Sequence, residues 1–202
     1  MDHLASLAAL RRLYDLPKER AIKKQLAALD VHCIRFVSLS PFVVLATHGA
    51  DGTADASPRG GAPGFVRVHG AHTLLIPDAP GNNRLDTLEN IVATGQLGLL
   101  FMIPGLDETL RVNGPAVLST AAEDLAATSD ARRTAKLAIR VTVREAYLHC
   151  AKAFMRSDLW AAAARFDRAA LPTAGQMLCD HTGVSTPPET PEAMRQRYEP
   201  DL

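Results

Sequence analysis

The chain has 202 residues, of which 47% are hydrophobic and 22% are charged, and its 22 Lys and Arg balance 22 Asp and Glu. This composition is typical of a globular protein, and the length predicts a single domain over residues 1–202. Zero net charge excludes the basic surface of a non-specific nucleic-acid-binding protein. No apolar run reaches about 18 residues without a charge, so we expect no membrane span.

Cysteine usage predicts a reducing, cytoplasmic compartment. Cys33, Cys150 and Cys179 are odd in number, far apart and without a C-x-x-C pair, so neither a disulfide framework nor a metal site is expected. His149 and Cys150 are adjacent, and neighbours on a strand point to opposite faces. We therefore do not expect these two to share a proton or a metal ligand.

The first 30 residues predict a helical arm. Residues 2–13 have leucines at helical spacing, Pro17 interrupts them, and a second helix is expected from Lys18 to Asp30. Helices this short are not stable alone, so the arm must pack on another part of the protein.

A run of strands is expected from Val31 onward. β-branched and aromatic residues, a Gly and Asp turn and an alternating segment predict a hairpin over residues 42–57. A second pair of short strands follows, at 65–68 and 73–76. The residues between the two pairs, 57–64, combine Gly and Pro and predict a loop.

One helix is expected between the strands. Asn82 and Asn83 are suitable N-caps, because a short polar side chain can accept from free backbone N–H groups. Leu85, Leu88 and Ile91 then recur at helical spacing and give an apolar face.

The remaining elements follow from apolar runs, alternation and helical spacing. They are a central strand buried on both faces, a return strand bent at its Gly-Pro pair, a short helix, a long alternating strand and three helices: residues 96–103, 108–117, 121–129, 136–148, 151–166, 173–181 and 191–198. Six or seven successive strands with one inserted helix predict a small antiparallel barrel or sandwich with helices at both ends.

Two arginines lie at expected strand ends in Gly- and Pro-rich segments, Arg59 and Arg84. A guanidinium, free N–H groups and the positive end of a helix dipole together suit a phosphate group. If neighbouring strands pair, the two segments meet at one rim of the barrel. The alternative is an ordinary capped helix with two unrelated surface arginines, and these residues alone leave both open.

A further cluster, Lys152, Arg156 and the single Trp, Trp160, follows the last strand. A planar cofactor needs an aromatic or aliphatic wall and a few charges. The alternative is a Trp that packs in the interior or at an interface. The sequence contains no Ser-His-Asp order, H-E-x-x-H, P-loop or dinucleotide fingerprint, so the catalytic residues stay unknown.

Seven motifs follow one another in a single order, beginning at residues 57, 63, 74, 80, 98, 108 and 150: SPRG, PGFV, LLIPD, PGNNRLDTL, GLLF, ETLRVNG and CAKAFMRS. Over roughly residues 20–165 the sequence resembles pyridoxamine 5′-phosphate oxidase-like flavoproteins of the FMN-binding split-barrel superfamily, in particular a bacterial FMN-dependent subgroup. The resemblance implies a mainly β fold, a six-stranded antiparallel split β-barrel over 31–149 between an N-terminal helical arm (1–30) and a C-terminal helical extension (150–202). It also implies a homodimer with FMN at the subunit interface.

The resemblance also implies which residues bind FMN. The phosphate would be held from the second hairpin strand and the start of the inserted helix, by Ser57, Arg59, Asn82, Asn83 and Arg84. The flavin ring would lie along the strand before that helix and against the return strand, beside Ile76, Pro77, Asp78, Thr109 and Arg111. The second subunit would contribute Lys152, Arg156 and Trp160. Related proteins often have Arg-Lys at the helix start, and Asn83 here keeps a hydrogen-bond donor but loses a charge.

The C-terminus departs from authentic pyridoxamine phosphate oxidases, which end in an Arg-Leu-x-Pro signature, whereas this chain ends in PETPEAMRQRYEPDL. We therefore do not expect vitamin B6 oxidation. The expected function is that of an FMN-dependent oxidoreductase acting on an unidentified small molecule. The alternatives are an F420-dependent reductase of the same fold and a non-catalytic flavin-binding or haem-utilisation-type sensor.

Overall fold

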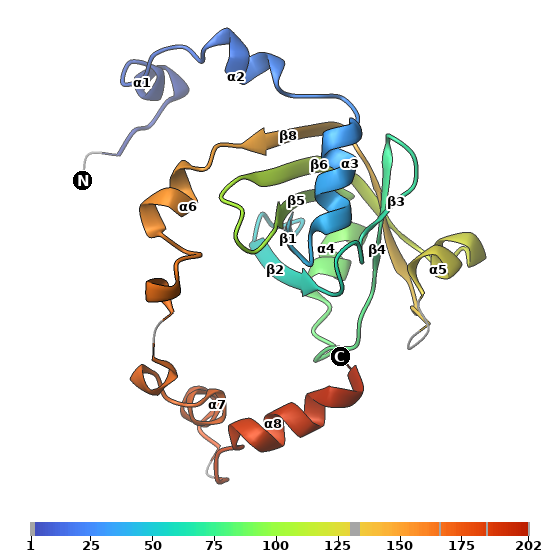
Figure 1. The fold of residues 1–202 in the computed structure, drawn as a ribbon, viewed down its shortest axis with the longest axis vertical. Helices are drawn as coiled ribbons and strands as arrows, with labels where there is room; N and C mark the ends of the chain where they lie inside the picture. Colours follow the sequence, from blue (N-terminus) through green and yellow to red (C-terminus); the bar gives the residue numbers. More distant parts are fainter. Residues whose placement is uncertain (1–2, 130–133, 166, 185, 202) are drawn as a thin grey trace.

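The computed structural model describes residues 3–129, 134–165, 167–184 and 186–201. Within these ranges it forms a curled antiparallel eight-stranded sheet with the order β2-β1-β5-β6-β7-β4-β3, and β8 pairs with β6 off this path. Figure 1 shows the sheet wrapped around α3 and α4, with α5 outside it and both terminal segments extending away. The expected fold class, an antiparallel barrel with helices at both ends, is confirmed.

The bounds of the elements are as follows. The strands are β1 (Phe42–His48), β2 (Ala54–Gly60), β3 (Arg67–Val68), β4 (Thr73–Pro77), β5 (Gln96–Met102), β6 (Thr109–Ser119), β7 (Ala138–Thr142) and β8 (Glu145–His149). The helices are α1 (Leu7–Arg11), α2 (Glu19–Lys23), α3 (Val31–Leu39), α4 (Asp86–Thr94), α5 (Ala122–Thr128), α6 (Lys152–Ser157), α7 (Ala174–Thr182) and α8 (Pro191–Tyr198), with 3-10 turns η1 (Ala162–Ala164), η2 (Arg168–Ala170) and η3 (Glu199–Asp201).

Strand β6 changes its pairing partner along its length. Its residues 109–113 pair with β8, and its residues 116–119 pair with β7. The change of partner occurs at Gly114 and Pro115, where a Cβ on Gly114 would lie 1.9 Å from the carbonyl oxygen of Thr142. Only glycine fits this approach, so the expected bend at Gly-Pro is confirmed and has a steric cause.

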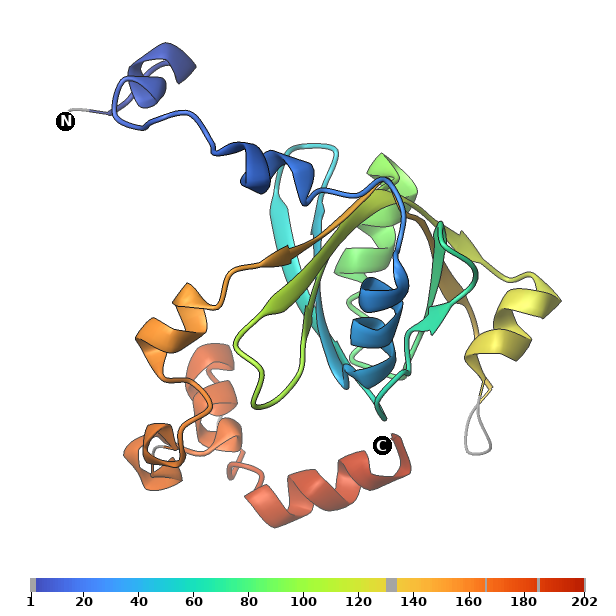
Figure 2. The ribbon, with the colours of Figure 1, turned by 45° about the horizontal axis from the view of Figure 1, so that its top comes forward.

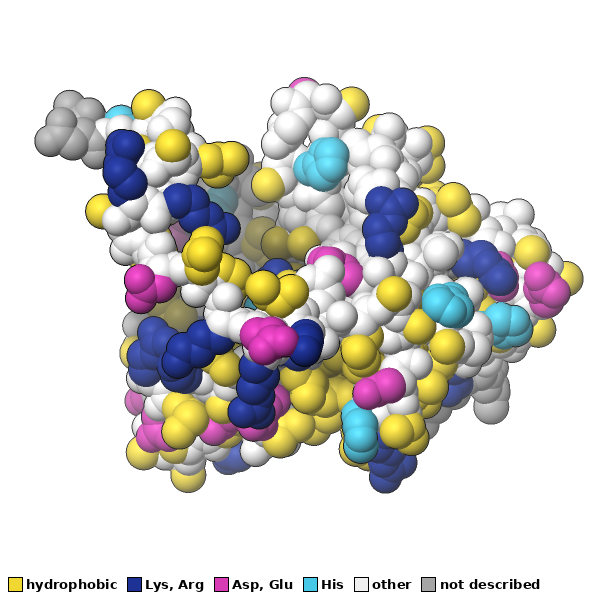
Figure 3. Space-filling model, turned by 90° about the horizontal axis from the view of Figure 1, so that it is seen from above, with side chains coloured by type: hydrophobic (Ala, Val, Ile, Leu, Met, Phe, Trp, Pro, Cys, Tyr) yellow, Lys and Arg dark blue, Asp and Glu magenta, His cyan; other side chains and the backbone are white. Residues whose placement is uncertain are grey.

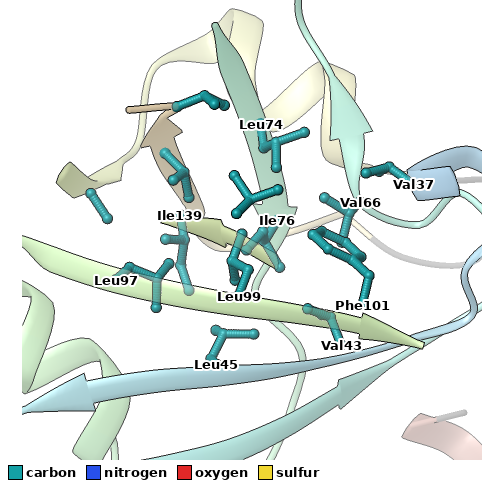
Figure 4. Close-up of a cluster of buried hydrophobic side chains, with 14 of the residues drawn as sticks. Val37, Val43, Leu45, Val66, Leu74, Ile76, Leu97, Leu99, Phe101 and Ile139 are labelled. Atoms are coloured by element: carbon teal, nitrogen blue, oxygen red, sulfur yellow. The ribbon is translucent and has the colours of Figure 1, made fainter. Parts of the chain in front are cut away.

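The core fills the inside of the barrel. Alternate residues of β1, β5 and β6 point inward, and α3 and α4 add their apolar faces. Figure 4 shows side chains from several strands and α3 meeting in one cluster, among them Val37, Leu45, Ile76 and Phe101. Each such side chain contributes roughly 1.5–3 kcal/mol on burial, so this cluster holds the strands that carry the candidate site.

Two N-terminal predictions are wrong. The second helix covers only Glu19–Lys23, because Leu26 instead exchanges two backbone hydrogen bonds with Ala146 at the edge of β8. The segment from Val31 is helix α3 and not strand, because the Asp30 carboxylate accepts from the Cys33 N–H at 2.8 Å and caps a helix.

Three strand predictions also need correction. The expected strand 136–148 is two strands, since Val143 and Arg144 turn away to donate to the carbonyls of His72 and Asn113. Residues 57–60, expected in a loop, pair with β1 as the end of β2. Strand β5 is central as expected, but only one of its faces is fully buried. The division of 136–148 adds one strand, so the structure has eight strands where the sequence patterns predicted six or seven.

Most other expected elements are confirmed, including the first hairpin, the return strand, α5, α7 and α8. The helix expected at 151–166 is shorter and ends at Ser157, where Asp158 adopts a left-handed conformation. Figure 2 shows that α1, α2 and the segment from α6 to α8 project from the barrel. In the part of the chain that the structure describes, no helix has the length and apolarity to cross a membrane.

Candidate functional site

One face of β2 carries three polar side chains in a row. Asp55, Ser57 and Arg59 alternate with exposed residues and are themselves half-buried. In the pairing of β1 and β2, these three residues lie directly opposite inward-facing residues of β1. The row therefore continues the inner face of the barrel at its edge, where α4 packs against β1 and β2.

Asp55 connects the start of α4 to this row. Its carboxylate accepts from the hydroxyls of Thr87 at 2.8 Å and Thr47 at 3.2 Å, and from Ser57 at 3.0 Å. The Asn90 amide extends the network by donating to the Thr47 hydroxyl at 3.0 Å. Since these residues come from β1, β2 and α4, the network fixes the first turn of α4 beside the start of β2.

The segment before α4 has an unusual backbone. Asn83 and Leu85 both have φ of 60°, a left-handed conformation that is uncommon for leucine. Helix α4 begins only at Asp86, and the predicted N-caps are wrong. The reason is local, since the Asn82 side chain accepts from the N–H of Arg84 at 3.1 Å and closes a turn before the helix. No side chain caps α4 within the described residues, so its first N–H groups stay available to a ligand.

Arg84 lies at this uncapped end. Its guanidinium binds Asp86, with Nε 2.9 Å from Oδ2, and both side chains are largely exposed. The hydrogen bond to Asp86 raises the pKa of Arg84, and the charge of Asp55 adds to the effect. The same bond lowers the pKa of Asp86. An exposed pair of this kind is weak, so an incoming anion can compete with Asp86 for Arg84.

Arg59 is the second arginine expected to bind the phosphate, and it lies near the end of β2. Its Nη1 donates to the carbonyl oxygen of Pro58 at 2.9 Å, and it forms no ion pair among the described residues. Arg59 lies in a strand, although the sequence suggested a loop. The structure thus brings the strand of Arg59 and the helix start after Arg84 together through Asp55 and Thr87.

The residues at the end of β4 that were expected to contact the flavin ring differ in which atoms a ligand could reach. The Ile76 side chain is fully buried in the core, as Figure 4 shows, which leaves only its backbone for a ligand. Pro77 and Asp78 are half-buried at the end of the strand, and the Asp78 N–H donates to the Leu137 carbonyl at 3.1 Å.

Thr109 and Arg111 lie on the other face of the sheet. Arg59 is level with the inward-facing Val43, whereas Arg111 is paired with Leu100, which points outward. We call the side of β1, β5, β6 and β8 that is turned away from the core the outer face. One subunit therefore does not bring Thr109 and Arg111 together with Arg59.

The outer face holds a cluster that the sequence reasoning missed. Arg111 Nη1 donates to the Tyr147 hydroxyl at 3.0 Å, and Lys24 Nζ lies 5.4 Å from the centroid of the Tyr147 ring. The Tyr147 and His149 rings are 5.3 Å apart. The alternation of Glu145, Tyr147 and His149 along β8 was the available signal, but the contact with Lys24 is not visible in the sequence.

His149 has an unusual environment within this cluster. Its Nε2 is buried and has no hydrogen-bond partner in the described ranges. Burial lowers the pKa of His149, and the nearby charges of Arg111 and Lys24 lower it further. This environment therefore favours the neutral form of the imidazole.

Trp160 anchors the segment after β8. Its Nε1 donates to the Leu106 carbonyl at 3.0 Å, and its ring stacks on Phe154 with centroids 5.6 Å apart. In this subunit it therefore acts as a packing residue that attaches α6 to the turn between β5 and β6. Lys152 and Arg156 are exposed on α6 and form no ion pair with other described residues.

Comparison with known proteins agrees with this architecture. A family model described as pyridoxamine 5′-phosphate oxidase matches residues 30–150. The structure of HupZ from Group A Streptococcus matches with a TM-score of 0.50 and 15% identity, covering 59% of this chain and 93% of that chain. At this identity the likeness concerns the fold alone.

Two further structures are similar over much the same part of the chain. A Clostridium acetobutylicum protein related to general stress protein 26 of B. subtilis, of the pyridoxinephosphate oxidase family, has a TM-score of 0.45 and 11% identity over 59% of this chain and 86% of that chain. An FMN-binding protein from Syntrophomonas wolfei subsp. wolfei has a TM-score of 0.41 and 14% identity over 58% and 81%. No curated protein matches the sequence.

Proposed function

Because the chain belongs to the pyridoxamine 5′-phosphate oxidase family, we propose that it binds FMN and acts as an FMN-dependent oxidoreductase on a small molecule. The observation that carries the proposal is the uncapped start of α4, which follows Arg84 and is joined through Thr87 and Asp55 to β2, the strand that also carries Arg59. When bound, the flavin would supply two-electron redox chemistry, and the protein would supply binding and orientation.

The donor set suits the phosphate group of FMN. Two guanidiniums and the free N–H groups of a helix start are the groups that phosphate monoesters prefer. Asp55 is also near, but its carboxylate already accepts from three hydroxyls, which satisfies it locally. Asp86 competes for Arg84 from an exposed position, so phosphate binding would replace a weak pair with a stronger one.

A homodimer is part of the proposal. A compact monomer of 21.7 kDa exposes about 9,200 Å² of surface, whereas this chain exposes 13969 Å². The excess is ample for an obligate dimer interface of a few thousand Å². Leu7 and Leu16 of the N-terminal arm are more than four-fifths exposed, at 81% and 83%, which supports burial against a second copy.

The dimer would also bring the expected ring-contacting residues to the FMN site. Arg111 is on the face opposite to Arg59, so the partner's outer face offers a way to place it at the flavin. Lys152 and Arg156 are unpaired among the described residues and exposed, as expected for side chains that reach a second subunit.

The three cysteines are free, which supports a reducing, cytoplasmic setting.

The test is flavin retention. The purified full chain is expected to show a flavin absorption spectrum, and the double variant Arg59→Ala, Arg84→Ala is expected to lose FMN. Arg67→Ala is the matched control, because Arg67 is also a strand arginine that donates to a nearby carbonyl, that of Gly64 at 2.9 Å. A colourless protein that takes up no added FMN would contradict the proposal. Tighter binding of F420, or a bound flavin that no reductant reduces, would favour the two alternative functions.

A further inference from the structure

We propose that the outer face of β6 and β8 is a second binding site, for a small planar carboxylate, formed by Lys24, Arg111, Tyr147 and His149. The site lies on the opposite face of the sheet from Arg59 and is distinct from the proposed phosphate site. Its role as a substrate site rests on the proposed function, but the binding itself does not.

The first argument is uncompensated positive charge. Lys24 Nζ and the Arg111 guanidinium lie 5.4 and 5.7 Å from the Tyr147 ring centroid, and neither forms an ion pair with any described carboxylate. Glu145 is the acidic residue of the same strand face, but its carboxylate accepts from Gln25 and Asn113. Two cations thus share one aromatic ring without a carboxylate in ion-pair contact with either, an arrangement that a bound carboxylate would complete.

The second argument is the supply of hydrogen-bond donors. The Tyr147 hydroxyl accepts from Arg111 at 3.0 Å, so its own proton is free to be donated. His149 Nε2 is buried and has no partner within the described residues. Buried polar atoms are nearly always hydrogen-bonded, so an unpartnered one indicates a group that the isolated chain lacks. A carboxylate oxygen can accept from both residues.

The third argument is the surface beside the cations. Arg111 is paired with Leu100, and the outward-facing residues of β1 and β5 next to it include Val44 and Met102, all half-buried and apolar. Figure 3 shows Lys and Arg side chains gathered on the side of the N-terminal arm, with hydrophobic side chains next to them. An apolar surface next to two cations fits a hydrophobic ring with one anionic end better than a hydrated inorganic anion.

The test uses benzoate as the probe, with benzamide as its neutral isostere and inorganic phosphate as the non-planar anion. Calorimetry on the full chain is expected to show benzoate binding at least tenfold tighter than either. Lys24→Gln and His149→Gln are each expected to weaken benzoate at least tenfold. Lys24 is exposed and its Nζ donates to the Leu148 carbonyl at 2.7 Å, so its replacement is expected to remove one surface hydrogen bond and leave the protein folded. Lys23→Gln is the control, because Lys23 is the adjacent lysine and pairs with Glu19.

Benzoate binding that is absent, or unchanged in both variants, would overturn the proposal. So would phosphate binding as tightly as benzoate. The failure of the flavin proposal is recognised separately, because FMN retention is measured on the same variants and depends on Arg59 and Arg84. If FMN is retained, benzoate is expected to shift the flavin spectrum, which supports a substrate site, and an unshifted spectrum would overturn that role.

Discussion

The Thr87 hydroxyl donates to the Asp55 carboxylate at 2.8 Å and joins the first turn of α4 to the edge strand β2. The two residues are 32 positions apart in the chain, and no covalent constraint holds them together. The bond joins the uncapped helix start to the strand that carries Arg59, so we expect it to help position the two for one phosphate.

Asp55→Ala is expected to lower both stability and FMN affinity. Three hydroxyls lose their acceptor, and polar groups left unsatisfied cost about 1–3 kcal/mol each when buried. Urea unfolding and FMN titration measure the two effects. Asp51→Ala is the control, because Asp51 is an exposed turn residue that, among the described residues, accepts only from Thr53. An Asp55→Ala protein that binds FMN normally would show that the network does not position the site.

Leu85→Gly is expected to stabilise the protein by roughly 1 kcal/mol, because glycine adopts a φ of 60° without steric cost. Leu85 is about half-exposed, so the burial lost is smaller than for a core leucine. Urea unfolding measures the change. Val92→Gly on the exposed face of α4 is the matched control and should destabilise by about 0.5–1 kcal/mol. A loss of stability in Leu85→Gly would indicate that Leu85 makes contacts worth more than its strain.

Gly114→Ala is expected to prevent the change of partners along β6. The added Cβ would meet the Thr142 carbonyl oxygen at 1.9 Å, so the backbone must move. We expect a loss above about 4 kcal/mol, the range of severe steric change, seen as aggregation or a collapse of the thermal transition. Gly81→Ala is the control, since no atom within 4 Å would meet its Cβ. A normally folded Gly114→Ala protein would disprove the steric role.

The pKa of His149 is expected to lie below the ordinary value for histidine, because burial and two cations disfavour its charged form. As the pH falls through 6.5, the unfolded chain takes up this proton before the folded chain does, so folding stability declines. NMR titration of the imidazole measures the pKa, and Lys24→Gln should raise it. His149→Gln should remove this part of the acid dependence. An unshifted imidazole in the wild type would contradict the arrangement of the cluster.

The sequence predicted those strands and helices that are determined by their own residues and by the turns next to them. The hairpin over 42–57 follows from alternation and a Gly and Asp turn, and β6 follows from its own alternation and its Gly-Pro pair. Helix α3 was missed because its aromatic and β-branched residues favour strands, although Asp30 as an N-cap was the available signal.

The candidate site was predicted only as far as residue identity allows. The motifs around Arg59 and Arg84 indicated the phosphate-binding segments, but not that Asp55 joins them. The faces of the sheet depend on register, so the separation of Arg111 from Arg59 was not visible. The contact between Lys24 and Tyr147 joins residues more than a hundred positions apart, which no local pattern encodes.

The paired hydrogen bonds between Leu26 and Ala146 have a further consequence. They cover part of the free edge of β8, which would otherwise present unpaired N–H and C=O groups to any extended chain. The N-terminal segment thus protects this edge from pairing with the edge of another molecule, in addition to bringing Lys24 to the outer face. In a protein shortened past Leu26, the edge of β8 would be free to pair with other chains, and the protein would be prone to polymerise even if its barrel is well packed.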